Sequence, residues 1–498
     1  MTDTTTTDEA AAASAPTGSA PTGSSTAPEA AVVPPEFRRL RGSLGVASIV
    51  FIVVAAASPL GVIGGPVPLG IAFGNGAAFP FTFIVVTAVL LLFAVGFTNA
   101  TPFVKSAGAF FAYVDKGLGR SAGLGAAFAA LLSYLALEAG VFGLFGPGAN
   151  ELLKSYGVPD VPWWVYAAVG FVVVSLLGYF KIELSGRVLA VLLIAEVLIV
   201  LALDAAVIFS GGGPEGFSTA FVTPSEIVSG APGFAILFAI LSFIGFEATA
   251  VFRDEAKDPE RTIPRATYIA LIAIGLFYTV SSWVLVTANG ESTIVENATE
   301  NAGTILATTT EQYLGTVGAH IIQVLFVTSL FACILSFHNI VARYVFTLAG
   351  RGVLPRALGD AHARHGSPAR ASVTASATVA VLIVVAVLLG LDPIAQFYTW
   401  LGGISSVGIV LLLVLTSVAV LAIFRRDAHG LGRWKTLVAP GLGLLGLLAF
   451  TVIIFQNLPV LVAEESYGPF SWGIIALFAA AFVAGPIVAR ARPAVELD

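Results

Sequence analysis

A long uncharged stretch near the start of the chain limits its possible folds more than any other feature. From Gly42 to Val104 the sequence has no acidic, basic or histidine side chain. Over all 498 residues, 57% are apolar or aromatic and 11% are charged, whereas roughly a quarter of the residues of a soluble domain are charged. A water-soluble fold is therefore excluded. The sequence predicts an all-α polytopic membrane protein, because helices that satisfy their own backbone hydrogen bonds can cross a bilayer.

Twelve segments are long and apolar enough to cross a bilayer, which takes about 20 such residues per helix. The predicted transmembrane segments are 44–74, 80–99, 121–149, 162–179, 186–209, 233–252, 266–288, 315–349, 371–390, 393–424, 436–457 and 467–489. The first, eighth and tenth are longer than one straight crossing needs. Tilt, a break or an extension beyond the membrane must absorb the excess.

The distribution of Lys and Arg among the loops predicts the orientation. Basic residues are retained on the cytoplasmic side of a membrane. With the N-terminus inside, Lys154 is the only one of 24 basic residues that falls on the outer side. We therefore expect a protein of the plasma membrane, with the lipid bilayer as its surroundings and both termini in the cytoplasm.

Charge and motif content exclude several classes of function. A net charge of −6 argues against a nucleic-acid partner, which would need a basic face. Cys333 is the only cysteine, so one chain can form neither a disulfide nor a cysteine-based metal site. The sequence has no Walker motif, zinc-spaced histidines or Ser-His-Asp pattern, so we expect neither an enzyme nor an ATP-driven pump. The sequence leaves the oligomeric state open.

The first segment contains a run that cannot continue as a regular helix. Residues 58–68 read SPLGVIGGPVP, with three prolines and three glycines. Proline lacks a backbone donor and clashes with the preceding turn, while glycine frees the backbone. We expect a broken helix whose free amides, near Gly61 to Gly65, face an anion such as a carboxylate. The alternative is a proline kink that packing absorbs.

The sixth segment carries an acid deep in the membrane. Glu247 follows Gly245 about 14 residues from the predicted outer end, roughly 20 Å into a core about 30 Å thick. A bare carboxylate at that depth costs on the order of 3 kcal/mol, so it should be protonated or paired. The alternative is a neutral Glu that only packs two helices together. Gly245 could mark a second break or serve close helix packing.

Interrupted segments at corresponding positions of two halves indicate a transporter built from inverted repeats. Segments one and six are five apart, which predicts one repeat at 44–209 and a second at 233–424, with two further helices at 436–489. Residues 1–43 are rich in Thr, Ala, Ser and Pro and are expected to form a disordered cytoplasmic tail. Residues 490–498 would be a cytoplasmic C-terminus.

Several ordered motifs resemble those of the amino acid/polyamine/organocation (APC) superfamily of permeases. They are SAGAFFAY at 106–113 with GLG at 117–119, FIGFE at 243–247 with DEAKDP at 254–259 and IPRA at 263–266, and RY at 343–344 with GRGVLP at 350–355. The resemblance covers about residues 44–424. It implies a sodium-symporter-like (LeuT-type) fold of five plus five inverted helices, with two helices added and a substrate held between broken helices one and six.

The resemblance also implies which residues bind a substrate. The amides of Gly61 to Gly65 would bind the carboxylate of an amino acid, and carbonyl groups near Phe243 to Gly245 would bind its ammonium group. The substrate-binding residues implied are Ser58, Gly61, Val62, Ile63, Gly64, Gly65, Phe243, Ile244, Gly245 and Phe246. Family members commonly have a Gly-x-Gly run where this chain has SPLG and then GGP, which leaves open which amides point inward.

Three intramembrane acids are candidates for proton coupling or gating. Glu247 aligns with an acid that resembles the proton-responsive gate of family antiporters. Glu196 stands where proton-coupled members often have a lysine in place of a sodium site, and it could carry a proton, join a sodium site or pair with another group. Glu138 could line the pathway. Asp204 is expected to lie in water. The pair His338-Asn339 is expected to serve packing, and titration near neutrality or a hydrogen bond to a neighbour is the alternative.

The sequence as a whole predicts a secondary active transporter that imports amino acids with protons by alternating access. Its partner would be a small-molecule amino acid or amine. No cofactor is expected, and either a proton or a sodium ion could be the coupling ion. An amine or polyamine carrier and an amino acid exchanger are alternatives in the same class. A channel or a transporter-like sensor is the alternative from a different class.

Overall fold

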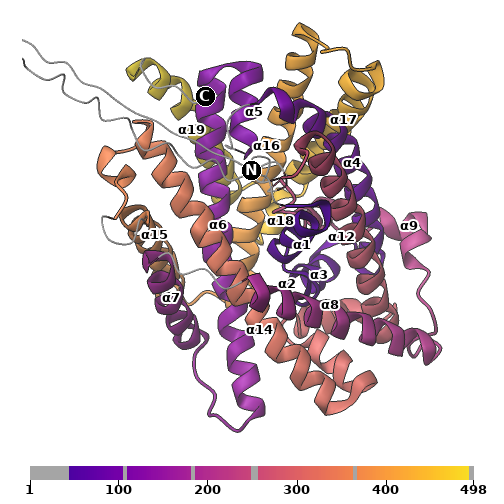
Figure 1. Cartoon of the computed structure of the whole chain (residues 1–498). Helices are drawn as coiled ribbons and strands as arrows, with labels where there is room; N and C mark the ends of the chain where they lie inside the picture. The colour runs from indigo at the N-terminus through magenta and orange to yellow at the C-terminus, as the bar shows by residue number, and fades with distance from the viewer. Residues whose placement is uncertain are drawn as a thin grey trace, which may run out of the picture. The chain divides into compact units, whose positions relative to one another are not determined.

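The computed structural model describes residues 44–104, 109–180, 186–247, 249, 256–362 and 367–492 (Figure 1). The predicted tail, 1–43, lies outside these residues, as do parts of two motifs at 106–108 and 254–255. Within the described residues the chain forms helices and no strand, apart from two isolated bridges. The predicted all-α class is confirmed.

The first predicted segment is divided into several short pieces. These are α1 (Val46–Ala56), α2 (Pro59–Gly64), α3 (Pro66–Gly70) and the π-helical turn η1 (Ile71–Asn75). The helices that follow are α4 (Phe79–Ala100), α5 (Ala109–Leu118), α6 (Arg120–Ser155), α7 (Trp163–Phe180), α8 (Gly186–Phe209), α9 (Pro224–Ile227) and α10 (Pro232–Leu241). Single 3₁₀ turns lie at η2 (Gly76–Ala78), η3 (Thr101–Phe103) and η4 (Ala220–Val222).

The second half of the chain is also helical. Its helices are α12 (Pro259–Asn289), α13 (Ile294–Glu300), α14 (Ile305–Gly350), α15 (Ala369–Leu388), α16 (Thr399–Arg426), α17 (Ala439–Gln456), α18 (Leu458–Leu461) and α19 (Pro469–Ala491). A 3₁₀ turn, η6 (Arg356–Gly359), precedes α15, and π-helical turns η7 (Pro393–Tyr398) and η8 (Trp434–Val438) open α16 and α17.

Eleven helices of the described chain are long and apolar enough to cross a membrane. The sixth predicted segment differs, because its apolar helix α10 ends at Leu241 and turns follow as far as Glu247. The twelve predicted crossings are thus eleven such helices and one short helix that is interrupted. Helix α14 leaves helical geometry at Gly315 (φ 70°, ψ 179°), the first residue of the eighth predicted segment, and then continues as helix to Gly350, so the excess length of that segment remains.

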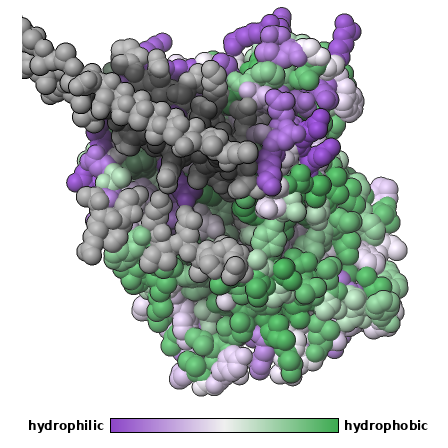
Figure 2. Space-filling model, in the orientation of Figure 1, coloured by the Kyte–Doolittle hydropathy of each residue, from purple (hydrophilic) through white to green (hydrophobic). Residues whose placement is uncertain are grey.

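Helix α6 lies at the centre of the bundle, and about three quarters of its most apolar 18-residue stretch is buried. It packs extensively against α14, α16 and α19, and the short helix α2 packs against α14, α8 and α12 (Figure 1). Helices α7, α8, α15, α17 and α19 instead present large apolar side chains at the surface. Figure 2 shows such side chains in a broad green zone, with hydrophilic ones gathered at the top of the view. This is the surface expected of a protein whose solvent is lipid.

The sequence did not predict helix α5, which packs against α6 and α16. Its Gly117 belongs to the GLG motif, and a Cβ there would lie 2.4 Å from the Ala419 carbonyl oxygen of α16. A side chain at this position would therefore force the two helices apart. The motif glycine is explained by close backbone approach.

Candidate functional site

The predicted break in the first segment is present. Helix α1 ends at Ala56, and Ser58 has a left-handed backbone (φ 49°, ψ 66°) before α2 begins at Pro59. A second interruption at Gly65 (φ −123°, ψ −82°) separates α2 from α3, which begins at Pro66. Both helices begin with proline, whose missing N–H is not needed in a first turn. A single proline kink in a continuous helix is therefore the wrong interpretation.

The Glu196 carboxyl group of α8 lies beside the start of α2. The Ser329 hydroxyl donates to Glu196 Oε2 (2.8 Å), so its oxygen accepts the bond from the Ser58 hydroxyl (2.6 Å). The Leu60 backbone amide also interacts with the Glu196 carboxyl group. Beside them, the Tyr278 hydroxyl donates to the Ala57 carbonyl at the break (3.3 Å). A side chain of the protein thus occupies part of the helix end that was expected to face a substrate carboxylate.

The glycines of α2 also allow close packing. A Cβ at Gly61 would lie 2.6 Å from Ser58 Oγ, one at Gly64 would lie 2.6 Å from the Phe326 ring of α14, and one at Gly65 would lie 2.6 Å from Leu144 Cδ1 of α6. These contacts hold the broken segment against two neighbouring helices. The glycines therefore have a packing role in addition to any role of their amides.

The break in the sixth segment is present too. Gly245 has a positive φ of 113° within the turns that follow α10. Its N–H donates to Glu247 Oε2 (2.9 Å), while the Tyr134 hydroxyl of α6 donates to Glu247 Oε1 (2.6 Å). A glycine in this conformation belongs to unwound backbone, so the predicted break at Gly245 is confirmed. Glu247 is buried and joins the break to α6.

Glu138 pairs with a histidine and does not line the central cavity described below. His338 Nδ1 lies 2.7 Å from Glu138 Oε1, and His338 Nε2 lies 2.8 Å from Ser372 Oγ of α15. All three side chains are buried. His338 also packs against α7, where a Cβ at Gly178 would lie 2.4 Å from its ring. The hydrogen-bonding alternative for His338 is confirmed and the preferred packing interpretation is wrong, because the residue links α6, α14 and α15.

The expectation for Asp204 was also wrong. Its side chain is 4% exposed and accepts a hydrogen bond from the Ser281 hydroxyl of α12 (2.7 Å). Ser281 is itself buried, and the pair joins α8 to α12. A count of residues from the predicted membrane boundary placed Asp204 in water, but packing between two long helices encloses it.

A cavity lies between the two breaks. It is lined by Ala57, Ser58, Gly61, Val62, Pro66, Leu137, Val141, Leu144, Leu241, Ile244, Leu330, Cys333, Phe337 and Tyr398. Its empty volume, including space open to solvent, is about 400 Å³. Among the predicted binding residues, Ser58, Gly61, Val62 and Ile244 line this cavity. Ile63, Gly64, Gly65, Phe243, Gly245 and Phe246 do not line it, and their role in binding stays a prediction.

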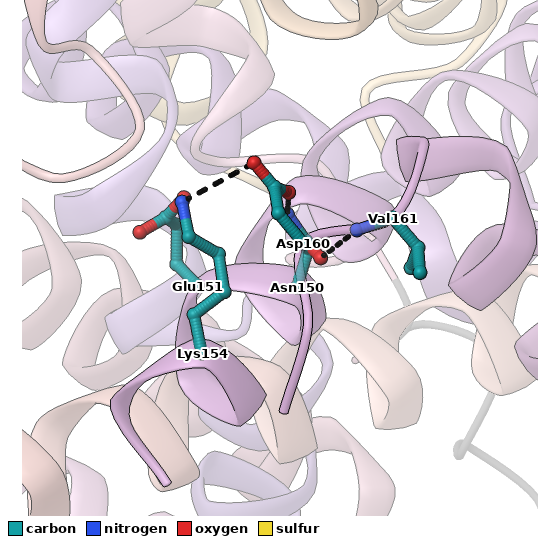
Figure 3. A network of polar contacts seen from close by, with 5 residues as sticks. All are labelled: Asn150, Glu151, Lys154, Asp160 and Val161. Carbon is teal, nitrogen blue, oxygen red and sulfur yellow. Dashed lines mark hydrogen bonds and ion pairs between the residues drawn. The ribbon is translucent and has the colours of Figure 1, made fainter. Parts of the chain in front are cut away.

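A second cavity lies beyond Gly64 and Phe326, and both residues contribute to its wall. Glu151 lines it and belongs to a polar network at the end of α6 (Figure 3). Lys154 Nζ lies 2.8 Å from Glu151 Oε1 and 3.7 Å from Asp160 Oδ2. The one basic residue expected on the outer side is thus balanced by two acids.

A comparison with models of protein families shows which family the chain belongs to. A family model described as amino acid permease matches residues 44–480. The chain belongs to this amino acid permease family, within the APC superfamily. In its described part the permease consists of helices and the loops between them, apart from two isolated bridges.

Relatives of this permease have several different substrates in their names. It is 25% identical to a probable GABA permease of Pseudomonas aeruginosa over 78% of its own length and 81% of the relative. It is 32% identical to the aromatic amino acid transport protein AroP of Escherichia coli O6:H1, over 26% of its own length and 29% of AroP. A low-affinity putrescine importer, PlaP of Escherichia coli K12, is 27% identical over 36% of the permease and 40% of PlaP.

A solved structure shows the fold of this permease. The manganese transporter of Eremococcus coleocola, in complex with an aromatic bis-isothiourea substituted compound, aligns with a TM-score of 0.57. It covers 91% of the permease and 99% of the transporter at 17% identity. Together with the two breaks, this likeness supports the sodium-symporter-like fold of inverted repeats with two added helices.

Sequence reasoning missed several polar partners in the permease. Tyr134 and Glu138 are four residues apart on α6, so they lie on one helix face. That spacing does not identify the observed partner of Tyr134, which is Glu247 of the sixth segment. Ser329 and Ser372 gave no comparable signal, because serine is common in membrane helices and nothing local identifies its partner. The cavity walls from α6 and α14 were missed because hydropathy does not orient a helix that is apolar all round.

Proposed function

We propose that this permease is a secondary active transporter that imports amino acids with protons by alternating access. The observation that supports this most strongly is the cavity bounded by two broken segments, next to two buried acids that contact those breaks. Unwound backbone at membrane depth is stable only where it is packed in protein or lines a cavity. Breaks at corresponding positions of two repeats are typical of the binding sites of transporters.

The proposed substrate position follows from the main chain that reaches the cavity. Gly61 and Val62 line it from the first break, and Ile244 lines it from the second. Amides near the start of α2 would bind the carboxylate of an amino acid, and carbonyl groups at the two breaks would bind its ammonium group. Glu196, which contacts the Leu60 amide, would restrict the carboxylate to the amides that follow.

The proposed coupling site is Glu247. As a carboxylate it accepts bonds from both Tyr134 and Gly245, which belong to α6 and to the broken segment. A proton on this carboxyl would turn one acceptor oxygen into a donor group and weaken one of the two bonds. Protonation would also remove the cost of enclosing a bare charge. We propose that proton binding at Glu247 and substrate binding at the adjacent break favour the same conformation.

Glu196 is the second candidate for the coupling site. Its carboxyl group, the Ser58 and Ser329 hydroxyls and the Ala57 carbonyl lie together at the first break. A proton on Glu196 and a sodium ion near it are alternatives that transport measurements distinguish. In the cell we place the protein in the plasma membrane with both termini in the cytoplasm, as its basic residues predict.

The test is uptake of labelled amino acids into proteoliposomes that contain the purified protein. We expect accumulation when the outside is acidic, none when an ionophore collapses the proton gradient, and no requirement for sodium. Sodium-dependent accumulation at constant pH would contradict proton coupling and assign the ion to sodium. Ion currents in the absence of counterflow would contradict the transporter itself and favour a channel.

The similarity to a putrescine importer favours an amine carrier as the second candidate function. Competition of labelled amino acid uptake by unlabelled putrescine separates the two. An exchanger would give uptake only into vesicles that are preloaded with substrate. Uptake into empty vesicles under a proton gradient would exclude obligatory exchange.

A further inference from the structure

The wall of the central cavity that α6 provides is apolar. Leu137, Val141 and Leu144 line the cavity and are spaced four and three residues apart, so they lie on one helix face. Each of these side chains is buried or partly buried in a helix that has no charged residue between Arg120 and Glu138 or between Glu138 and Glu151. A substrate side chain that extends from the breaks toward α6 therefore meets only hydrocarbon.

The wall formed by α14 has the same character. Leu330, Cys333 and Phe337 line the cavity at spacings of three and four residues. Leu241, at the end of α10, adds a further apolar side chain. Tyr398 contributes an aromatic ring and a hydroxyl group. The polar side-chain atoms of the lining belong to serine, cysteine and tyrosine, and none of them carries a charge at neutral pH.

The acids near the cavity belong to other contacts. Glu138 pairs with His338, Glu196 accepts from Ser329, and Glu247 accepts from Tyr134 and the Gly245 amide. None of these carboxyl groups lines the cavity. A second ammonium group that extends between the α6 and α14 walls would therefore have no carboxyl group of the lining in contact with it. An enclosed, unpaired charge is strongly unfavourable, whereas an alkyl or aromatic group gains from burial.

We propose that the cavity selects amino acids with an uncharged apolar side chain and excludes diamines and basic amino acids. This inference rests on the proposed transport function and names the substrate class of the same site. The carboxylate and the single ammonium group of the substrate are bound by main chain at the breaks. Its side chain packs between the Leu137–Val141–Leu144 face of α6 and the Leu330–Phe337 face of α14.

The first experiment is competition for uptake in proteoliposomes under a proton gradient. The labelled probes are leucine, lysine and putrescine, and each is competed with unlabelled leucine, valine, phenylalanine, lysine and putrescine. We expect the apolar amino acids to compete at concentrations at least tenfold lower than lysine or putrescine. Lysine or putrescine uptake that exceeds leucine uptake would overturn the substrate class while leaving the transport function intact. Uptake of none of the probes, together with no thermal stabilisation by any of them, would overturn both.

A matched pair of substitutions tests whether the wall sets this preference. Val141→Asp adds a carboxylate to the cavity, and Val141→Asn adds a polar group of similar size without a charge. We expect the ratio of lysine to leucine competition to rise at least tenfold in Val141→Asp relative to Val141→Asn. An equal ratio in the two variants would show that this wall does not contact the substrate side chain.

Leu144→Ala keeps the proposal testable if the aspartate variant does not fold. The smaller side chain widens the cavity opposite α14, so phenylalanine should gain relative to valine as a competitor by a few fold. Leu448→Ala is a matched control, because Leu448 is an exposed residue of α17 and lies outside the cavity lining. A phenylalanine-to-valine ratio in Leu144→Ala equal to that of Leu448→Ala would contradict the proposed side-chain site.

Discussion

The two breaks that bound the cavity are made in different ways. In the first segment, prolines and glycines interrupt the helix on both sides of α2. Glu196 of α8 interacts with the Leu60 amide, and Ser329 of α14 contacts the Ser58 hydroxyl. In the sixth segment, one glycine with a positive φ carries the break, and Glu247 binds its amide from two residues further on. Many residues therefore produce the first break, whereas the second depends on Gly245 and Glu247.

This difference predicts that the sixth segment is more sensitive to a single substitution. Glu247→Gln should have the largest effect, because an amide oxygen can replace only one of the two carboxylate acceptors and the remaining NH₂ faces a donor. Loss of a hydrogen bond to a charged group costs about 1.5–3 kcal/mol. We expect at least a tenfold loss of uptake and no remaining dependence on external pH, measured in proteoliposomes at equal protein content.

Tyr134→Phe is the control for this prediction. It removes the donor to Glu247 Oε1 and leaves the carboxyl group in place, so uptake should fall while its pH dependence persists. Unchanged pH dependence in Glu247→Gln would remove this residue from the coupling role.

Gly245→Ala tests the backbone of the same break. An L-residue at a φ of 113° is strained by about 1–3 kcal/mol, so we expect severalfold lower uptake and a lower melting temperature. Gly441→Ala in α17 is the matched control, since a Cβ there has no neighbour within 4 Å and its φ is not positive. Equal behaviour of the two variants would mean that the second break is not required in this conformation.

Ser58 tests the first break with a smaller expected effect. Ser58→Ala removes the hydrogen bond to Ser329, worth about 1 kcal/mol, and keeps a side chain on a left-handed backbone. Ser58→Gly also loses that bond but relaxes the backbone, so it should be milder by on the order of 0.5 kcal/mol. Thermal unfolding of the purified variants measures this difference. A more damaging glycine variant would show that the left-handed conformation of Ser58 is not strained.

A half-buried carboxylate that caps amides outside the membrane-spanning helices should matter least. A hydrogen bond from the Ser471 hydroxyl (2.6 Å) holds the pKa of the Glu464 carboxyl below its ordinary value, and backbone amides of Gly468 and Phe470 add to this effect. Because the folded pKa is lowered, the stabilisation is present at neutral pH and is lost as pH falls through that folded pKa.

Glu464→Gln should therefore lower the melting temperature only slightly at pH 7 and leave uptake unchanged. Its difference from the unsubstituted protein should shrink as pH falls below roughly 4, the ordinary pKa of a glutamate carboxyl. A loss of uptake as large as that of Glu247→Gln would show that burial is not what distinguishes the two capping acids.

The sequence alone determined the solvent, the helical class and the place of the first break. Uncharged stretches and the chemistry of proline and glycine act locally, so residues 42–104 predict lipid exposure and an interrupted helix without reference to any partner. The prediction that the Glu247 carboxyl group is protonated or paired succeeded for the same reason, because it needed only the position of Glu247 along its own segment. The same locality also explains why Asp204 was misplaced, because depth counted along one helix ignores the neighbouring helices.

Tertiary structure decided which partner each acid has and which side chains enclose the cavity. Glu138 meets His338, 200 positions later in the chain, and Glu196 meets Ser329, 133 positions later. Helices α6 and α14 are apolar on most faces, so only their packing fixes the rotation that directs Val141 and Phe337 toward the cavity. Rotation about a helix axis is set by contacts between distant segments, and no pattern along a single segment contains that information.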